Sequence, residues 1–195
     1  IWDRELRVLY RASSSAGADA SLLVVREAQF DKQSSAFVLL CEGPGYDTLA
    51  IALQSRSDYG WFKSSALKQR DARAILWKGL RRIAVGVHAL HAQQIMHRNV
   101  SPESVYMDLD DGPESMRLGA FEWSVRVGST AEKPPTESWS TPPEVLEGKG
   151  GYTFDADWYG LGMLIARCMV VAEGWRDMPA EARRNQVYRE LGATL

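Results

Sequence analysis

The sequence predicts an α+β fold in which a small strand-containing part precedes a larger, mainly helical part. Two short apolar runs, at residues 22–25 and 37–41, predict strands near the start of the chain. Segment 71–94 carries apolar residues at spacings of three and four, and 157–172 is apolar on nearly all sides, so both predict helices. A helix and two strands, a connector and then a helical region with short strands are typical of an α+β fold.

The elements of the first part follow from its composition. Residues 2–12 predict a short helix with its apolar residues on one face. A loop rich in Ser, Gly and Ala follows at 13–19, and the polar stretch 31–35 predicts the turn between the two strands. The sequence Glu-Gly-Pro-Gly at 42–45 ends any regular element.

The larger part contains short strands between its two long helices. Strands are predicted at 105–107 and 116–118, joined by an acidic turn at 108–112, and irregular structure is predicted at 122–143. The buried stripe of the first long helix is predicted to contain Ile75, Leu80, Ile83, Ala84, Val87, Leu90 and His91.

Shorter elements and large aromatic residues complete the expected fold. A short helix is predicted at about 48–54, and a polar, exposed helix is predicted from Met178 onward. Four tryptophans are predicted to anchor the core and its loops: Trp77, Trp123, Trp139 and Trp158.

Composition excludes several classes of protein. Of 195 residues, 45% are hydrophobic, which disfavours disorder, and the formal net charge of -2 gives no indication of a nucleic-acid partner. Cys41 and Cys168 are too few and too far apart for a disulfide framework, so a reducing, cytoplasmic compartment is expected. No apolar run approaches the about 20 residues that span a bilayer, so no membrane partner is expected. Because the chain starts at Ile1 without a signal-peptide pattern, we expect a fragment.

The most informative segment is 89–105, Ala-Leu-His-Ala-Gln-Gln-Ile-Met-His-Arg-Asn-Val-Ser-Pro-Glu-Ser-Val. It resembles the catalytic loop of protein kinases and the end of the helix before that loop. Three further landmarks of the family follow in order: 118–122 resembles the Asp-Phe-Gly segment, 141–144 the Ala-Pro-Glu segment, and 157–162 the start of the large buried helix. The resemblance implies a protein-kinase-like fold with a partial small lobe and a mainly helical large lobe.

The same resemblance interprets the residues upstream. Glu5 takes the place of the family's ion-pairing Glu, and Cys41, Glu42 and Pro44 resemble the gatekeeper and hinge that contact the adenine ring. Residues 1–43 then form a partial N-lobe that lacks the first three strands, with their Gly-rich loop and Lys. Residues 44–195 form a C-lobe that we expect to be incomplete at its C-terminal end. The run 4–11 weakly resembles part of large bacterial multidomain kinase-like proteins.

The resemblance places four degenerate residues at the positions that carry phosphoryl transfer. Asn99 replaces the catalytic Asp, and a neutral amide cannot take a proton. Ser101 replaces the Lys that steadies the transferred phosphate, Ser104 replaces the metal-binding Asn, and Ala120 replaces the metal-binding Asp. With all four altered, no intact catalytic site is expected.

Cofactor binding is expected to be weak or absent. Pro44 has no N–H to donate to an adenine ring, which removes about 1 kcal/mol of hydrogen bonding. Magnesium loses its usual ligands, although Glu122 remains a candidate replacement, and Asp108 and Asp110 are interpreted as a solvated turn. We therefore expect no cofactor, with weak binding of ATP and magnesium as the alternative.

Other landmark residues are expected to be structural. His97 is expected to pack under the loop, Asp157 to hydrogen-bond its backbone, and Phe121 and Glu144 to belong to the kinase core. Arg98 is expected to bond loop carbonyls or, alternatively, a phosphate on a neighbouring segment. The residues that could carry that phosphate are Ser129, Thr130, Thr136, Ser138, Ser140 and Thr141.

The resulting hypothesis is a pseudokinase, a catalytically inactive kinase-like module with a regulatory or scaffolding role. Its expected partner is another protein or an attached domain of the same parent protein. The alternatives are an ATP-dependent phosphoryl or nucleotidyl transferase with a rearranged metal site, and a switch that binds ATP without turnover. The strand at 37–41 lacks its usual neighbour in this chain, so we expect its apolar edge to be covered by another segment or subunit, and the isolated chain to fold poorly.

Overall fold

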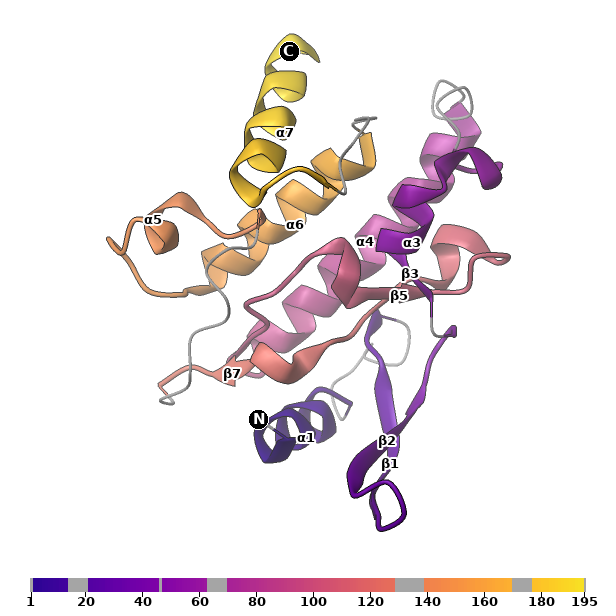
Figure 1. The fold of residues 1–195 in the computed structure, drawn as a ribbon, viewed down its shortest axis with the longest axis vertical. Helices are drawn as coiled ribbons and strands as arrows, with labels where there is room; N and C mark the ends of the chain where they lie inside the picture. The colour runs from indigo at the N-terminus through magenta and orange to yellow at the C-terminus, as the bar shows by residue number, and fades with distance from the viewer. Residues whose placement is uncertain are drawn as a thin grey trace.

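The computed structural model describes residues 2–13, 21–45, 47–62, 70–128, 139–169 and 177–194. Two long helices, α4 (Arg70–Ala92) and α6 (Phe154–Met169), lie side by side at its centre (Figure 1). The N-terminal helix and a β-hairpin lie at one end of the molecule, and the C-terminal helix lies at the other. The predicted division into a small strand-containing part and a larger helical part is confirmed.

The small part consists of α1 (Trp2–Ser13) and the antiparallel strands β1 (Val24–Asp31) and β2 (Ala36–Glu42). The predicted turn is confirmed, because the Asp31 carboxylate accepts hydrogen bonds from the backbone N–H groups of Gln33 (3.0 Å) and Ser34 (3.1 Å). β1 is longer than the sequence predicts, and a β-bulge between Val25 and Glu27 shifts its register against β2.

The larger part adds short strands and helical turns around α4 and α6. A three-stranded sheet has the order β3 (Asp47–Thr48), β5 (Val105–Met107), β6 (Arg117–Leu118), and β4 (Ile95–Met96) pairs with β7 (Val125–Arg126). The remaining elements are α3 (Leu49–Gln54), η1 (Arg56–Asp58), η3 (Pro102–Ser104), η4 (Gly112–Ser115), η5 (Phe121–Trp123), α5 (Pro143–Leu146) and α7 (Ala180–Thr194).

The two parts are joined by one hydrophobic core. Leu22 forms an isolated parallel bridge with Leu118 of β6, and the backbone N–H of Leu23 donates to the Leu118 carbonyl at 2.9 Å. Side chains from both parts belong to a single buried cluster that includes Val8, Leu22, Val25, Leu80, Ile83, Leu90, Phe121 and Leu164. The small part is therefore anchored to the helical part through both backbone and core contacts.

Several sequence predictions about burial are wrong. Ile75 and Trp77 on α4 are 37% and 48% exposed, and Trp158 on α6 is 40% exposed although its ring meets that of His91 edge to face. Trp139, by contrast, is buried as predicted. The C-terminal helix is not purely exposed, since Val187 is fully buried against Trp139 and α6.

A buried arginine links η1 to the end of α6. Arg56 Nη2 donates to the backbone carbonyl of Arg167 at 3.1 Å and to that of Cys168, and its guanidinium lies over the Phe62 ring. Burial lowers the pKa of Arg56 to about 10. A cation at the C-terminal end of a helix satisfies carbonyls that the helix leaves open.

Within the described residues, no helix is both long and apolar enough to cross a membrane.

Candidate functional site

Asp157 organises the segment between the two long helices. Its carboxylate accepts hydrogen bonds from the backbone N–H of His97 (2.8 Å) and of Arg98 (2.6 Å), and it also bonds His91 Nε2 at 2.8 Å. Its side chain is fully buried in the first turn of α6. The bonds from Asp157 to the loop backbone are those that the sequence predicts, and they tie residues 97–104 (the 97–104 loop) to α6.

His97 lies beneath the 97–104 loop and is fully buried. Its Nε2 donates to the carbonyl of Gly119 at 2.8 Å, and its ring meets Phe121 edge to face with centroids 5.4 Å apart. Burial lowers the pKa of His97 below its ordinary value, and the charge of Asp157 opposes part of that shift. A neutral, enclosed imidazole that joins two segments is a structural group.

Arg98 bonds a loop carbonyl, which is the first of the two alternatives that the sequence leaves open for it. Its Nε donates to the backbone carbonyl of Trp123 at 2.7 Å, and its guanidinium carbon lies 5.6 Å from the centre of the Tyr152 ring. Of the candidate phosphate carriers, Ser140 and Thr141 are buried, and the other four lie outside the described residues.

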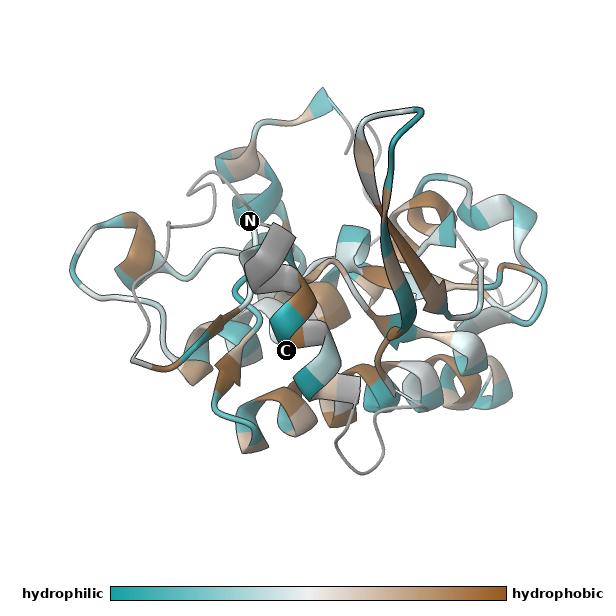
Figure 2. Cartoon of the chain, turned by 90° about the horizontal axis from the view of Figure 1, so that it is seen from below, coloured by the Kyte–Doolittle hydropathy of each residue, from teal (hydrophilic) through white to brown (hydrophobic). Residues whose placement is uncertain are grey.

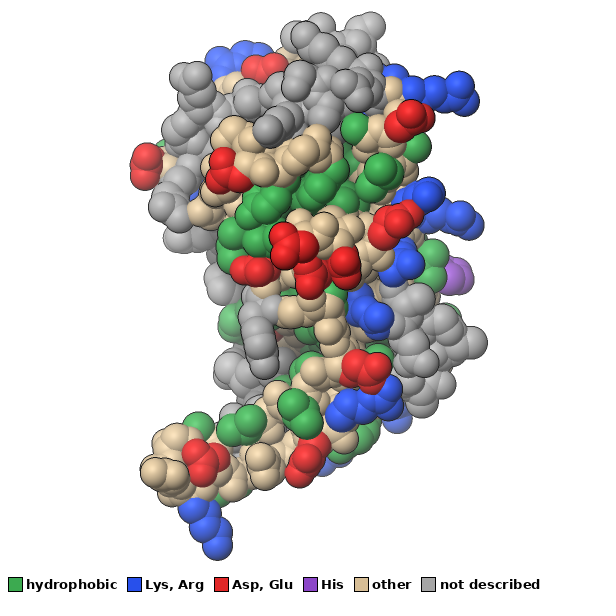
Figure 3. Space-filling model, turned by 90° about the vertical axis from the view of Figure 1, so that its right-hand side faces the viewer, with side chains coloured by type: hydrophobic (Ala, Val, Ile, Leu, Met, Phe, Trp, Pro, Cys, Tyr) green, Lys and Arg blue, Asp and Glu red, His purple; other side chains and the backbone are tan. Residues whose placement is uncertain are grey.

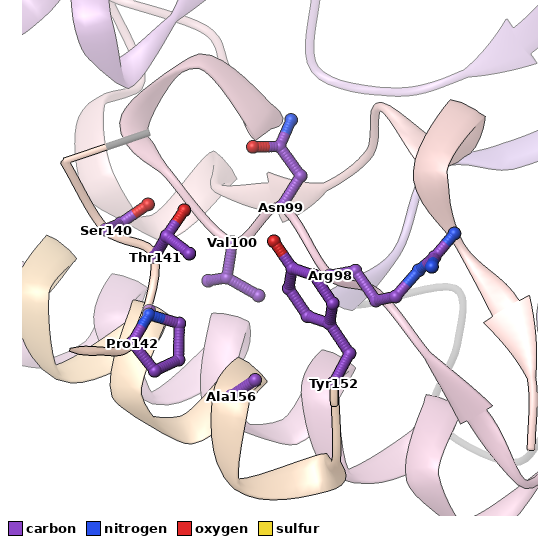
Figure 4. A pocket seen from close by; sticks show the side chains of 9 residues that line it. Arg98, Asn99, Val100, Ser140, Thr141, Pro142, Tyr152 and Ala156 are labelled. Carbon is purple, nitrogen blue, oxygen red and sulfur yellow. The ribbon is translucent and has the colours of Figure 1, made fainter. Parts of the chain in front are cut away.

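A small cavity lies beside Asn99. It is lined by Arg98, Asn99, Val100, Ser140, Thr141, Pro142, Tyr152, Ala156 and Gly160. Figure 4 shows the Tyr152 hydroxyl turned toward this space, while the Asn99 amide extends away from the Tyr152 ring. The cavity measures about 10 Å³, which is the room of at most one water molecule. The space next to Asn99 is too small to admit a side chain of another protein.

Ser101 and Ser104 are turned into the loop instead of toward solvent. Both are buried, and the Ser104 hydroxyl donates to the Ser101 carbonyl (2.9 Å) and accepts from the Ser101 N–H (3.0 Å). The carbonyl of Ser104 in turn accepts from the N–H of Gly119 at 2.8 Å. The oxygen that replaces a metal ligand in the family pattern is therefore engaged in holding the η3 turn.

Ala120 precedes η5 in the left-handed conformation, at φ 57° and ψ 61°. A residue with a Cβ reaches this region at a cost of about 1–2 kcal/mol, and Asp or Asn tolerates it better than Ala. Ala120 and Ser104 together offer Mg²⁺ no side-chain oxygen that is not already bonded. Glu122 is half-buried, and no three His, Cys, Asp or Glu side chains cluster as a metal site among the residues that the structure describes. The carboxylate of Asp108 accepts from the N–H groups of Asp110 and Asp111, so this region is a turn.

The hinge-like residues lie at the end of β2. Cys41 is exposed and is paired with Val25, and Glu42 is exposed and forms an ion pair with Arg26. Pro44 follows, half-buried.

Two bulky side chains fill the junction between this hinge and the 118–122 segment. A Cβ on Gly119 would lie 2.4 Å from Leu23 Cδ1 and 2.8 Å from the Tyr106 ring, and a Cβ on Gly43 would lie 2.4 Å from Leu23 Cδ2. The Leu23 side chain therefore occupies the space between Gly43 and Gly119, and the Tyr106 ring packs beside Gly119.

The remaining landmark residues are Glu144 and Glu5. Glu144 lies in the first turn of α5 with an exposed side chain, and its carboxylate makes no hydrogen bond or ion pair with the described residues. Glu5 lies on α1, but its side chain is outside the described part, so its ion-pairing role stays a prediction.

Sequence reasoning missed two residues of this site, His91 and Tyr152. The sequence predicts His91 only as part of a buried helix stripe, whereas its ring bonds Asp157 and packs against Phe154, with ring centroids 4.4 Å apart. Burial raises the pKa of Tyr152, although a hydrogen bond with Thr141 and the charge of Arg98 oppose the rise. Spacing along one helix could not reveal either contact, because each partner lies on another element.

Comparison with known proteins agrees with this arrangement. The model of the family described as "Protein kinase domain" matches residues 17–194. The chain belongs to the protein kinase family. The kinase-like α+β fold, with antiparallel strands in a small lobe and a mainly helical large lobe, is thereby confirmed.

Individual relatives are distant and considerably longer. The Aurora kinase of Schizosaccharomyces pombe is 28% identical over 111 residues, which cover 56% of this chain and 30% of that protein. Ribosomal protein S6 kinase 2 alpha of Gallus gallus is 30% identical over 121 residues, 58% of this chain and 15% of that protein. Eukaryotic translation initiation factor 2-alpha kinase 1 of Plasmodium falciparum is 26% identical over 91 residues, 46% of this chain and 6% of that protein. The matched regions are therefore a minor part of each of these kinases.

Proposed function

We propose that this chain is a pseudokinase module, which transfers no phosphate and acts as a regulatory or scaffolding domain. The observation that carries the proposal is the Ser104–Ala120 pair. The hydroxyl of Ser104 is buried and bonded twice within its own turn, and Ala120 has no oxygen to offer. Phosphoryl transfer depends on oxygen ligands that hold metal ions on the phosphates and on a residue that orients the attacking hydroxyl. Asn99 adds a group that cannot accept a proton.

Weak nucleotide affinity follows from the same region. Pro44 has no N–H to donate, and Leu23 and Tyr106 fill the junction between Gly43 and Gly119. An adenine ring would have to displace aliphatic and aromatic carbon while gaining fewer hydrogen bonds. We expect thermal shifts of the full-length protein to show no magnesium-dependent stabilisation by ATP. Tight binding, in the low micromolar range or below, would favour an ATP-binding switch instead.

The decisive experiment is a radiolabelled phosphotransfer assay on the full-length protein. The parent is compared with an Asn99→Ala, Ala120→Val variant in magnesium and in manganese. We expect neither protein to transfer phosphate above background. Transfer by the parent that disappears in the variant would overturn the proposal, because this site would then contribute to chemistry.

The position of β2 at the edge of its sheet supports a role in protein association. In the described part of the chain β2 pairs with β1 only, and Val38 and Leu40 are 40% and 56% exposed. The strands of this hairpin carry hydrophobic residues on a ribbon that projects from the rest of the fold (Figure 2). Unpaired apolar strand edges are sites of pairing with another strand. We propose that an attached segment or a partner protein covers this edge.

Changing that edge tests the association. In the full-length protein, Leu40→Lys places a charge where the strand edge would be covered. We expect this variant to release the covering segment, seen as faster hydrogen exchange at the β2 amides. The control is Leu146→Lys in α5, away from the hairpin. Unchanged exchange in the Leu40→Lys protein would contradict the proposal.

A further inference from the structure

A second surface, separate from the candidate site described above, lies along α4. It is a groove of about 440 Å³, within the range of binding sites for small ligands or a few side chains. Its lining consists of Ser21, Lys78, Arg81, Arg82, Val85 and Glu114. We refer to these residues as the α4 groove.

The walls of the α4 groove are set by two glycines of α4. A Cβ on Gly79 would lie 2.4 Å from the carbonyl oxygen of Pro113, so only glycine lets η4 approach the helix this closely. A Cβ on Gly86 would lie 3.0 Å from the carbonyl oxygen of Ser21, which brings the start of the hairpin onto the same helix. The floor between the two walls is a stretch of well-packed helix, so the groove is preformed.

The floor is a single stripe of the helix. Lys78, Arg81, Arg82 and Val85 follow at spacings of three and four and therefore share one face. Lys78 is exposed but bonds Glu114 on the η4 wall at 2.9 Å. Arg81 and Arg82 make no hydrogen bond or ion pair with other residues in the described ranges, although Arg82 contributes to the lowered pKa of Glu114. Val85 is 44% exposed between them and the Ser21 wall.

The charge of this helix contrasts with that of the chain. α4 contains five Lys or Arg residues against one Asp, a net charge of +4, whereas the whole chain has a formal net charge of -2. Figure 3 shows Lys and Arg side chains along one side of the face that includes this region, beside a group of Asp and Glu side chains. Among the described residues neither Arg81 nor Arg82 forms an ion pair, and two such arginines in a preformed groove favour an anionic ligand.

We propose that the α4 groove docks an acidic segment of a partner polypeptide, with carboxylates on Arg81 and Arg82 and an aliphatic side chain on Val85. The exposed valine gives an aliphatic side chain a place to bury, which a phosphate backbone does not use. This inference rests on the proposed regulatory function and names the chemistry of the partner.

The test is a binding measurement on the full-length protein. The probe is a short labelled peptide of alternating Glu and Leu, followed by fluorescence anisotropy, and the comparison probe has Lys in place of each Glu. We expect only the acidic peptide to bind, and its affinity to fall as salt is added. An Arg81→Glu, Arg82→Glu variant should weaken this binding by about tenfold or more. Val85→Asp, at an exposed position, should weaken it as well.

The matched control reverses two exposed charges elsewhere, in an Arg126→Glu, Lys149→Glu variant, and should bind as the parent does. Equal loss in this control would overturn the proposal, because the effect would then follow net charge alone. Failure of the acidic peptide to bind the parent would also overturn it. So would an equally tight complex between a single-stranded oligonucleotide and the groove. Phosphotransfer activity would refute the proposed function without changing any of these binding results, so the two failures are distinguishable.

Discussion

The two sides of the 97–104 loop differ in what their polar groups do. On the α6 side, Asp157 receives three hydrogen bonds and His97 joins the loop to Gly119, so every polar group serves the fold. On the opposite side, the Ser104 hydroxyl bonds only within its own turn and Ala120 presents no polar side chain at all. The first side forms a rigid frame, and the second has lost the groups that the kinase pattern directs at phosphates.

The difference indicates that the buried frame residues can be kept while the residues at the chemistry-bearing positions change. The frame residues are buried, so removing one leaves unsatisfied donors inside the protein and costs several kcal/mol. At two of the chemistry-bearing positions of the family pattern, the small residues Ser104 and Ala120 stand in turns that remain intact. The fold can therefore persist after residues at the chemistry-bearing positions have changed.

The largest effect should come from the frame. Asp157→Ala removes the acceptor of the His97 and Arg98 N–H groups and the partner of His91, and should lower the free energy of unfolding by about 3–5 kcal/mol. Chemical denaturation of the full-length protein measures this. The control, Asp155→Ala, changes an exposed carboxylate two residues away and should cost less than about 1 kcal/mol. Equal losses of unfolding free energy in the two variants would contradict the distinction between buried frame residues and exposed residues.

A smaller effect is expected at Ser104. Ser104→Asn restores the residue type of the family pattern, but it places a larger side chain in a fully buried site and breaks the bonds to Ser101. We expect a loss of about 1–3 kcal/mol by denaturation. A variant of unchanged stability that also binds Mg²⁺ with ATP would contradict this prediction. The side chain at position 104 would then point toward the phosphates instead of into its own turn.

The buried His97 should make stability depend on pH. Its pKa is lowered in the folded state, mainly by burial, so below the ordinary value of 6.5 the unfolded chain takes up a proton that the folded protein does not. The contribution of His97 to the free energy of unfolding is complete above about pH 6.5. It is lost as pH falls, by at most about 1.4 kcal/mol per pH unit. Between pH 7 and pH 5.5 we expect about 1 kcal/mol, measured as the difference in slope between the parent and His97→Gln. His88→Gln, at an exposed site of α4, is the matched control.

The smallest effect should be a gain. Ala120→Gly relieves the left-handed conformation of Ala120 and should stabilise the protein by about 0.5–1 kcal/mol, after the greater flexibility of glycine in the unfolded chain is deducted. Thermal denaturation would detect it. Ala156→Gly, in α6, is the opposite control and should destabilise by about 1 kcal/mol. Destabilisation by Ala120→Gly would mean that the Ala120 methyl group contributes packing that outweighs the backbone strain.

Local patterns predicted most of the fold. The helices α4 and α6, the strand β5, the turn of the hairpin and the helix α3 lie close to the predicted ranges, because each depends on apolar periodicity or turn residues within one segment. The two-residue strands β4 and β7 were missed, since so short a strand has no periodicity and exists only through its pairing. Ile75 was wrongly placed in the core because periodicity defines a face but not what covers it.

In the candidate site, too, some features follow from the sequence alone and others only from the tertiary structure. The residue types at 99, 101, 104 and 120, and with them the absence of a base and of carboxylate or amide metal ligands, are properties of the sequence alone. Tertiary structure decided that the Ser104 hydroxyl turns inward, that His91 reaches Asp157, and that Leu23 meets Gly43 and Gly119. It also decided that Gly79 and Gly86 bring two distant segments onto α4 to form a basic groove. Chemical identity belongs to each residue, whereas burial and bonding partners depend on segments far apart in the chain, which only packing brings together.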